Sequence, residues 1–403
     1  MKQGYLSQYF KGVAVKVLSA VEADVVKSNQ HEFNGVSPLK KIFGTVRRTF
    51  SAKFVYLADN DDEPVVDTGS LTWYDAREHH LTRTEHRMYF QTTSVSVCAA
   101  AGDMLFVGLR PDDSVMVIIT ESHSTIGNQL LWLFGIEDTS HPGFSVREEL
   151  ESEQDRIEFA SRFILEEMGI IVETNAETYL EEMLQRFKGK YPATKDFSKY
   201  ARSTLKDVTP SDNPDDVIMA WMEREEILFR TLERYLLSER LDKGFSGDVD
   251  GFLQFSLSVQ NRRKSRAGQA LENHIEQLLI GRSIRYDRTK VTEKKSKPDF
   301  IFPGIEAYHD MAYDISLLTM LGVKSTCKDR WRQVLSEADR IENKHLLTLE
   351  AAISENQTDE MISRNLQLVV PQSLHKTYTA EQQQWLLNLN AFIEIVLKRQ
   401  GIR

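Results

Sequence analysis

The sequence predicts two domains: the first mainly β and barrel-like, the second α/β with a central mixed sheet. Three observations support this prediction. The chain has 403 residues, more than a single domain usually holds. Residues 1–135 contain short β-prone segments separated by turn signals, as in a barrel or a sandwich. The C-terminal half alternates strand-like and helix-like segments, which is typical of an α/β sheet.

The expected strands of the first domain are short apolar runs bounded by Gly, Pro, Asn or Asp. They are 13–18, 54–59, 88–100, 104–109 and 115–120. From about residue 145 to about residue 187 the apolar residues recur with a helical period instead. We therefore expect the β-rich part to be followed by helices.

Two polar stretches that contain proline, 189–196 and 207–216, are the best candidates for a linker. They place an N-terminal domain at 1–180 and a C-terminal domain at 213–403. The residues between them, 181–212, are expected to form a hinge or linker.

The second domain is expected to begin with a long amphipathic helix, which an Asp-rich turn precedes. The expected helices are 217–240, 265–281, 328–341 and 380–398, with one more between the last two strands. The expected strands are 283–286, 300–302, 313–317, 323–324, 345–350 and 366–371. This alternation predicts a sheet covered by helices.

Charge and cysteine content narrow the class of protein. The formal net charge is −10, which by itself argues against a polyanionic partner. The basic residues are clustered at 261–266 and 324–332, however, so one face could be cationic. Two cysteines exclude a disulfide framework and a zinc site built from cysteine pairs. Since no apolar run has membrane-spanning length and no signal-peptide core is present, we expect a cytoplasmic protein without a membrane partner.

An acid–lysine pattern in the second domain predicts phosphodiester hydrolysis. This reaction needs a divalent ion held by carboxylates and a cation near the attacking water or the developing charge. Asp299 stands at the mouth of an apolar strand, and Lys324 ends another strand 25 residues later. The acid that commonly lies two positions before the lysine is absent, because that position is Gly322. Glu337 can replace it if the following helix folds back beside the sheet, and Glu272 could add an outer carboxylate.

A plainer interpretation of these residues stays open at this point. A Pro-Asp pair is a common turn signal, and a lysine at a strand end is usually solvated. The basic neighbourhood favours a nuclease, since clustered cations suit a polyanion. This cluster consists of Arg262, Arg263, Lys264, Arg266, Lys328, Arg330 and Arg332. Trp331, between two arginines, is expected to pack in the core rather than to stack on a base.

Five blocks of the C-terminal half share their order and spacing with a known family. They are SVQNRRKSRAGQALENHIE (258–276), KKSKPDFIFP (294–303), AYHD (307–310), VKSTCKDRWRQVLSEADRI (323–341) and LVVPQSLHKTY (368–378). Together they cover most of residues 240–380 and resemble the catalytic half of the EcoRII-like type II restriction endonucleases. The resemblance implies a restriction-endonuclease-like PD-(D/E)XK fold with a displaced glutamate.

The resemblance also implies roles in catalysis. Asp299 and Glu337 would bind Mg²⁺. Lys324 would orient the attacking water and stabilise the negative charge of the transition state. Glu272 would be a further acidic member of the catalytic set, and Tyr308 matches a tyrosine near the active site of the family.

The resemblance also implies that a second group of residues takes part in DNA recognition. Lys328, Asp329 and Arg330 would read the outer G·C pairs of the site. This is chemically reasonable, because cations donate to guanine N7 and O6 and a carboxylate accepts from cytosine N4. Arg263 matches an arginine of the family's dimer and recognition region.

The resemblance is thinner upstream. Residues 73–90, WYDAREHHLTRTEHRMYF, resemble the DNA-binding stretch of the family's effector domain, a barrel-like domain that blocks the catalytic cleft until a second site is bound. The charged positions of that stretch are Arg77, Arg83, Glu85 and Arg87. Leu81 and His86 stand where the family has lysines, which leaves a different or weaker effector preference open. Without the resemblance, a solvated strand pair of alternating charge would explain the same residues.

The sequence thus predicts a type II restriction endonuclease that cuts both strands of double-stranded DNA, with Mg²⁺ as cofactor and no small-molecule cofactor. The resemblance implies a homodimer, whose two-fold symmetry would match that of a short site. It also implies a site with CC and GG flanks, such as CCWGG, and activation by a second site bound at the N-terminal domain.

Two other functions fit parts of the pattern. A modification-dependent endonuclease would use aromatic residues of the N-terminal domain as a pocket for a modified base. Candidates for that pocket are Trp73, Tyr74, Tyr89 and Phe90. A DNA-binding regulator with a decayed nuclease fold is less well supported, because the acids and the lysine of the pattern are all present.

Overall fold

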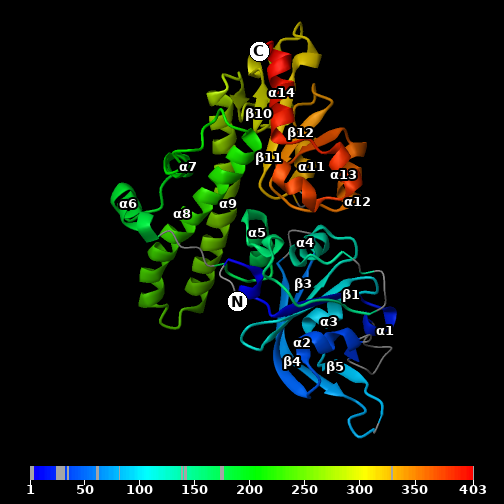
Figure 1. The fold of residues 1–403 in the computed structure, drawn as a ribbon. Coiled ribbons are helices and arrows are strands. Elements are labelled where there is room, and N and C mark those ends of the chain that lie inside the picture. The colour runs from blue at the N-terminus through cyan, green and yellow to red at the C-terminus, as the bar shows by residue number, and fades with distance from the viewer. Residues whose placement is uncertain are drawn as a thin grey trace. The chain divides into compact units, whose positions relative to one another are not determined.

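The computed structural model describes residues 4–23, 32–33, 36–59, 63–80, 82–137, 139, 143–172, 177–327 and 330–402. The chain divides into two compact units (Figure 1). The first contains Met1–Val172 and Ala351–Gln357, and the second contains Glu173–Glu350 and Thr358–Arg403. Within the described ranges, no helix combines the length and the apolar character needed to cross a membrane.

The first unit is mainly β, as the sequence predicts. Its strands are β1 (Gly12–Val17), β2 (Glu32–Phe33), β3 (Arg48–Leu57), β4 (Val65–Asp75), β5 (His86–Phe90), β6 (Met104–Leu109), β7 (Val115–Thr120) and β8 (Ser145–Arg147). They form one sheet in the order β2-β5-β4-β3-β7-β6-β1-β8, in which only β3 and β7 are parallel neighbours. The edge strands β2 and β8 do not pair with each other among the described residues, so the expected barrel-like closure is not seen there.

Apolar side chains of these strands fill a core on each face of the sheet. The helices of this unit are α1 (Ala20–Ala23), α2 (Lys40–Phe43), α3 (Ser94–Cys98), α4 (Thr125–Phe134) and α5 (Phe159–Glu167). Helices α4 and α5 contribute to the core that contains Phe106 and Ile118. Helices α2 and α3 contribute to the core that contains Phe54 and Trp73. The sheet is therefore covered on both faces, which explains the continuously buried strands β6 and β7.

The expected strand 88–100 is wrong beyond its first residues. Strand β5 ends at Phe90, and α3 follows. Thr93 and Ser96 form a capping box, in which each side chain bonds the backbone of the other residue. Such side-chain bonds compete with strand pairing and favour a helix start.

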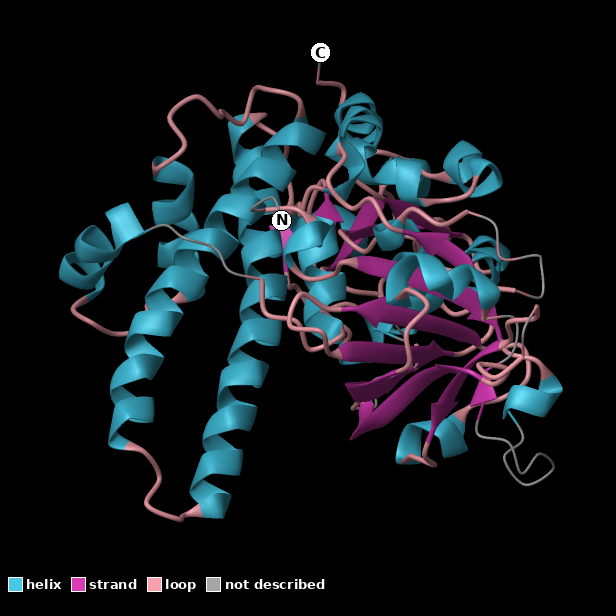
Figure 2. Ribbon diagram, turned by 60° about the horizontal axis from the view of Figure 1, so that its bottom comes forward, coloured by secondary structure: helices cyan, strands magenta, loops and turns pink. Residues whose placement is uncertain are grey.

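Helices dominate the beginning of the second unit. They are α6 (Glu177–Phe187), α7 (Thr194–Ser203), α8 (Pro214–Lys243) and α9 (Val249–Gly281). Figure 2 shows α8 and α9 side by side as a long helical hairpin. The expected helix at 217–240 is confirmed, with Asn213 as its N-cap and Pro214 in its first turn. Helix α9 begins well before the expected residue 265, because Asp248 caps it at Val249.

The segment expected as a hinge or linker, 181–212, contains most of α6 and all of α7. Buried Phe197 and Tyr200 of α7 share an apolar cluster with Leu228 and Phe229 of α8. The segment is therefore largely helical and packed, rather than an extended connection.

A mixed sheet forms the rest of the second unit, as predicted. Its strands are β9 (Asp287–Arg288), β10 (Phe300–Phe302), β11 (Thr319–Lys324), β12 (Lys344–Thr348) and β13 (Leu366–Val369). Their order is β13-β12-β11-β10-β9, with β11, β12 and β13 parallel and β9, β10 and β11 antiparallel. The accompanying helices are α10 (Ile305–His309), α11 (Trp331–Val334), α12 (Glu355–Ser363), α13 (Ala380–Trp385) and α14 (Leu389–Gln400).

Several expected boundaries in this region are wrong. Residues 283–286 form no strand, and 313–317 end in a 3₁₀ turn, Ile315–Leu317, that the side chain of Asp314 caps. The expected helix 380–398 is divided into α13 and α14, because Leu387 bridges to Val369 of β13. The apolar residues of each stretch fit the expected strand or helix. A local side-chain hydrogen bond or a bridge to another strand sets the conformation instead.

The expected helix 328–341 is also wrong in extent, since α11 covers only Trp331–Val334. Lys328 and Asp329 lie outside the described residues. Trp331, Val334 and Ala338 are fully buried at the helical spacing that suggested the longer helix. Ala338 has a φ of 50°, so the chain turns after α11 and presents the same apolar residues without a helix.

Asp215 ties the start of α8 to the start of α14. Its side chain accepts hydrogen bonds from the backbone N–H groups of Gln372 (3.1 Å), Leu389 (2.8 Å) and Asn390 (3.0 Å). Asp215 is only 2% exposed. It therefore satisfies orphan donors at the first turn of α14 where water has little access.

We expect Asp215→Ala to lower the free energy of unfolding by about 2–4 kcal/mol, because three buried N–H groups lose a charged acceptor. Urea unfolding measures this loss, with Asp216→Ala as the control because Asp216 is the exposed neighbour. Equal unfolding midpoints for the two variants would show that the hydrogen bonds to Asp215 do not stabilise the second unit.

Candidate active site

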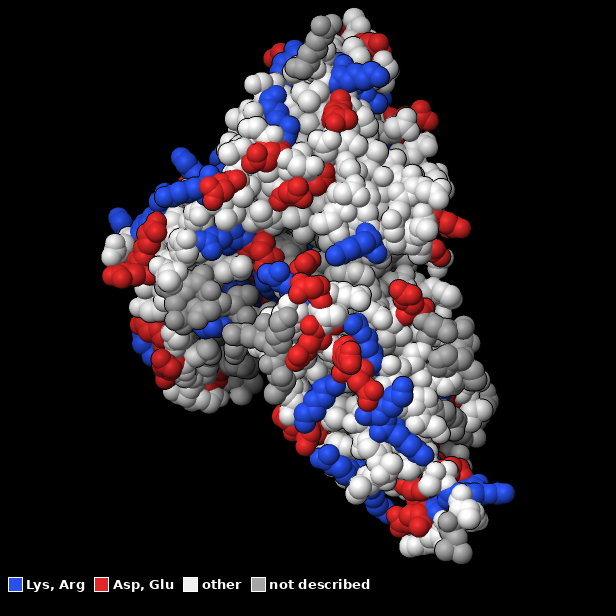
Figure 3. Space-filling model, viewed as in Figure 1, with Lys and Arg blue, Asp and Glu red and all other residues white. Residues whose placement is uncertain are grey.

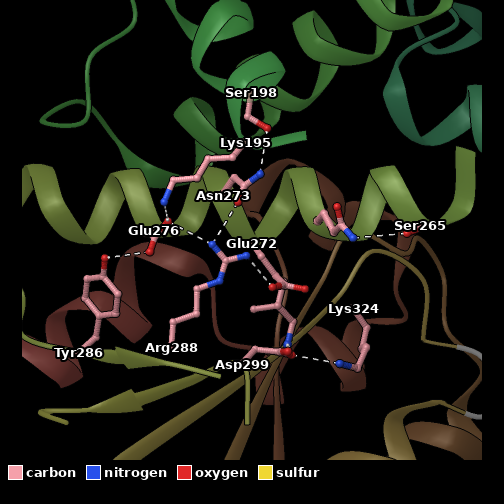
Figure 4. Close-up of polar contacts among 12 residues, drawn as sticks. Lys195, Ser198, Ser265, Glu272, Asn273, Glu276, Tyr286, Arg288, Asp299 and Lys324 are labelled. Carbon is pink, nitrogen blue, oxygen red and sulfur yellow. Dashed lines mark hydrogen bonds and ion pairs between the residues drawn. The ribbon is translucent and has the colours of Figure 1, made fainter. Parts of the chain in front are cut away.

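Asp299 and Lys324 meet where two antiparallel strands lie side by side. Asp299 directly precedes β10, and Lys324 is the last residue of β11. The pairing of Phe300 with Leu321 places the start of β10 beside the end of β11. Oδ2 of Asp299 accepts hydrogen bonds from Lys324 Nζ (3.0 Å) and from the backbone N–H of Val323 (2.7 Å) (Figure 4). The structure thus brings the predicted acid and lysine together.

Glu337 joins this pair from the turn after α11, not from a helix as the sequence suggested. Burial, followed by the negative charge of Asp299, raises the pKa of Glu337 to about 7. Its Oε2 atom is buried and accepts no hydrogen bond from the described residues. The charge of Glu337 is therefore only partly compensated by Lys324 and Lys344.

The position two residues before Lys324 has no room for an acid. A Cβ atom on Gly322 would lie 2.9 Å from Cγ2 and 3.1 Å from Cγ1 of Val334. Val334 is fully buried in α11, which packs on this part of the sheet. The turn that begins just after Val334 then carries Glu337 toward Asp299. Packing at Gly322 thus accounts for the displaced glutamate.

We expect Gly322→Ala to lower the free energy of unfolding by about 1–3 kcal/mol, because overpacking forces α11 away from β11. Thermal or urea unfolding measures the change. Gly268→Ala in α9 is the matched control, since an added Cβ there meets nothing within 4 Å. If Val334→Ala does not reduce the cost of Gly322→Ala, the steric explanation is wrong.

Glu272 approaches the site from α9. Burial raises the pKa of its carboxyl group, and the charge of Asp299 acts in the same direction, whereas Arg288 opposes both. Arg288 Nη2 donates to Glu272 Oε2 over 2.7 Å. Sequence reasoning placed Glu272 near the site but missed Arg288, because no motif or spacing marks this arginine.

Tyr308 is buried in the second unit, and its hydroxyl is bonded there to polar groups. Tyr308 is 0% exposed, and its hydroxyl donates to Glu293 Oε2 (2.6 Å) and accepts from the backbone N–H of Arg340 (3.2 Å). Glu293 also accepts from the backbone N–H of Asp339 (3.2 Å). Tyr308 therefore supports the turn that follows Glu337, and its catalytic role stays a prediction.

The described part of the basic cluster is less exposed than its sequence suggests. Arg263 pairs with buried Glu233 of α8 (2.7 Å). Arg266 is buried, and its guanidinium donates to Glu225 (2.9 Å) and to Glu226. Both arginines hold the α8–α9 hairpin together. Arg330 remains exposed at the start of α11.

Three of the four charged positions predicted in the first unit lie together near the β4–β5 connection. Glu85 pairs with Arg77 (2.5 Å) and with Arg87 (2.9 Å), and Arg87 also pairs with Glu32 (2.9 Å). Arg83 is exposed on the connection between the strands. Basic and acidic groups are intermingled on the face of the molecule drawn in Figure 3.

The four aromatic residues near these charges differ in burial and in bonding. Trp73 and Phe90 are buried in the core of the first unit. Tyr74 donates to Glu32 Oε1 over 2.6 Å, and Tyr89 is exposed. Two of the four candidates for a modified-base pocket, Trp73 and Phe90, are therefore part of the core.

The acid pair of the second unit fits a hard divalent cation. Oδ1 of Asp299 and Oε2 of Glu337 accept no hydrogen bond from the described residues. Mg²⁺ is commonly held by one or two carboxylates together with water molecules. The described residues contain no group of three or more His, Cys, Asp or Glu side chains arranged around a common metal position. Asp299 and Glu337 are therefore the candidate carboxylate ligands, and water or backbone carbonyl oxygens would supply the rest.

Comparison with known proteins identifies the second unit. Residues 229–393 match the family model described as EcoRII C terminal. The type II restriction enzyme EcoRII of Escherichia coli is 43% identical over 205 residues, which are 51% of this chain and 50% of that protein. The type II restriction enzyme SsoII of Shigella sonnei is 27% identical over 188 residues, 39% of this chain and 60% of that protein. The chain thus matches about half the length of these relatives.

Two solved structures are also similar to this chain. Metal-depleted Ecl18kI in complex with uncleaved, modified DNA has 18% identity and a TM-score of 0.46, covering 57% of this chain and 86% of that one. The complex of restriction endonuclease PspGI with substrate DNA has 18% identity and a TM-score of 0.44, covering 52% and 93%. The family match includes the predicted catalytic acids and lysine and confirms the resemblance seen in the sequence: residues 229–393 of this chain are similar to the EcoRII C-terminal family.

Proposed function

We propose that the protein is a type II restriction endonuclease that cuts both strands of DNA at a specific short site in the presence of Mg²⁺. The observation that carries this proposal is the contact of Lys324 with Asp299, both of which act electrostatically on Glu337, in a region that matches the EcoRII C-terminal family model. An acid pair and a lysine in one place are what metal-assisted phosphodiester hydrolysis requires.

Each of these side chains has a distinct part in the proposed reaction. Asp299 and Glu337 would hold the ion, which when bound would polarise a water molecule and neutralise charge on the phosphate. Lys324 is fixed 3.0 Å from Asp299, so its ammonium group is pre-positioned to orient the attacking water and to stabilise the charge that develops on the phosphate. Partial burial of both groups strengthens this electrostatic effect.

Specificity would come from the region around α11 and from the symmetry of the assembly. Arg330, with Lys328 and Asp329, would read the outer G·C pairs through the major groove. We propose a CC/GG-flanked target such as CCWGG. Two copies of the chain would act as a homodimer, each cutting one strand, with Arg263 in the recognition and dimer region.

Digestion of a fully sequenced plasmid tests the proposed activity. Full-length protein with Mg²⁺ should produce double-strand breaks at one short sequence, identified by sequencing the fragment ends, and EDTA should abolish them. Random nicking or no cleavage would refute site-specific hydrolysis. The same plasmid with and without methylated cytosine or adenine separates a conventional restriction enzyme from a modification-dependent one.

We further propose that the N-terminal domain, residues 1–180, binds a second copy of the site and relieves inhibition. A plasmid with one site should then be cut slowly, and a short duplex carrying the site should accelerate cutting about tenfold or more, a coupling of about 1.4 kcal/mol. A scrambled duplex is the control. Arg77→Ala combined with Arg87→Ala should remove the acceleration, and a variant that keeps it would exclude these positions from effector binding.

A further inference from the structure

Arg288 lies at the centre of a polar network beside the candidate active site. It is in β9, paired with Phe300 of β10, and Phe300 directly follows Asp299. Its guanidinium donates to Glu272 (2.7 Å), Asn273 (3.0 Å) and Glu276 (3.1 Å) of α9. Figure 4 shows Glu272 between Arg288 and Asp299. One arginine therefore links three acceptors on one helix to the strand next to the reacting groups.

The other partners of Arg288 are themselves fixed. Glu276 accepts a hydrogen bond from the hydroxyl of Tyr286 (3.2 Å) and pairs with Lys195 of α7 (3.6 Å). The side-chain amide of Asn273 donates to Ser198 of α7 (3.3 Å). The guanidinium also lies 5.8 Å from the ring centroid of Phe300. Arg288 is thus held from several sides, which makes it a rigid donor for Glu272.

The hydrogen bond from Arg288 matters because Glu272 lies near the charged groups of the candidate active site. Its side chain is 22% exposed and interacts electrostatically with both Asp299 and Lys324. Asp299 also acts electrostatically on Glu337, so both glutamates feel the same aspartate. Without a fixed cation on Glu272, a third carboxylate would be free to turn toward Asp299 and compete for the ion.

We propose that Arg288 is a positioning residue that holds Glu272 as an outer carboxylate, close to Asp299 but outside the ligands of the ion. The inference rests on the proposed function, since it assumes that Asp299 and Glu337 bind a divalent cation. Glu272 then contributes negative charge beside the site without binding the ion. Asp299 and Glu337 offer the ion the carboxylate oxygens that accept no hydrogen bond. Groups that orient the neighbours of metal ligands commonly change affinity or rate about 10- to 100-fold when they are removed.

A mutant cycle on full-length protein tests this inference. The variants are Arg288→Met, Arg288→Lys, Glu272→Gln and the Glu272→Gln/Arg288→Met double variant. Arg288→Met should slow single-turnover cleavage about 10- to 100-fold, and Arg288→Lys should restore part of the rate. In the Glu272→Gln background, Arg288→Met should change the rate by less than about twofold, because the residue acts through Glu272. Tyr286→Phe is the matched control, since it removes a bond of the same network at Glu276, and it should cleave like the wild type.

Calorimetric titration of the metal-free proteins with Mn²⁺ gives a readout that does not need cleavage. Arg288→Met should tighten Mn²⁺ binding about tenfold where Glu272 is present, by releasing an extra ligand, and by less than about twofold in the Glu272→Gln background. Equal effects in both backgrounds, in rate or in Mn²⁺ affinity, would overturn the positioning role while leaving the proposed nuclease intact. If the wild type cleaves no DNA, the proposed function fails, and the Mn²⁺ cycle alone still decides whether Arg288 acts through Glu272.

Discussion

Lys324→Ala should abolish cleavage and leave DNA binding in place. The lysine supplies the only cation hydrogen-bonded to Asp299 among the described residues, at 3.0 Å. Its removal takes away the charge that would stabilise the transition state, whereas Arg330, which is proposed to read the site, is a separate group at the start of α11. We expect the single-turnover rate to fall about 10²- to 10³-fold or more, with the dissociation constant for site-bearing DNA changed by less than about tenfold.

Two measurements separate these effects. Rapid quench of cleavage with enzyme in excess gives the chemical rate, and gel retardation without a divalent ion gives DNA affinity. Lys290→Ala is the matched control, because Lys290 is an exposed lysine just after β9 and should cleave normally. Residual cleavage by Lys324→Ala within about tenfold of the wild type would count against a catalytic lysine.

The core of the candidate site could be predicted because its geometry is largely local to the sheet. Asp299 and Lys324 flank apolar strand segments, and residues at adjacent ends of neighbouring strands meet. Glu337 was predicted in a helix but lies in a turn, since the turn at Ala338 depends on tertiary packing. Helical spacing of buried residues does not distinguish a helix from a turn that buries the same side chains.

Other features could not be predicted because they depend on contacts between distant segments. Arg288 meets α9 through bonds that span 12 to 16 residues, and Asp215 meets α14 across 174 and 175 residues. Tyr308 was expected at the site, yet its hydroxyl is directed to Glu293 and the turn at Arg340. In each case the residue type is common, and only the folded arrangement gives it a role.

The strand β4 was missed for a related reason. It contains Asp67, Gly69 and Ser70, which lower its β propensity, but it pairs with β3 over nine residue positions. Pairing with a long, half-buried neighbour overrides the weak local preference. The sequence therefore identifies strands that are apolar along their length better than strands that are held by their partners.

Glu337→Gln should inactivate the enzyme and yet stabilise the metal-free protein at alkaline pH. Burial, followed by the charge of Asp299, raises the pKa of Glu337 from 4.5 to about 7 in the folded state. Between these two values the folded protein keeps a proton that the unfolded chain releases, so the stability of the wild type falls as pH rises through this window. At pH 8 the group is charged in both states, and the folded state carries the cost of a half-buried, poorly compensated carboxylate.

Glutamine has the same shape without the charge. We expect Glu337→Gln to raise the free energy of unfolding by about 1–2 kcal/mol at pH 8, after allowance for solvent screening, and to leave it unchanged near pH 4. Urea unfolding in EDTA across this range measures the difference, and Glu342→Gln, at an exposed acid, is the control. Added Mg²⁺ should stabilise the wild type more than Glu337→Gln, because only the wild type offers both carboxylates. A variant that is less stable than the wild type at pH 8 in EDTA would mean that the charge of Glu337 is already compensated, and the site would then have no need of a cation.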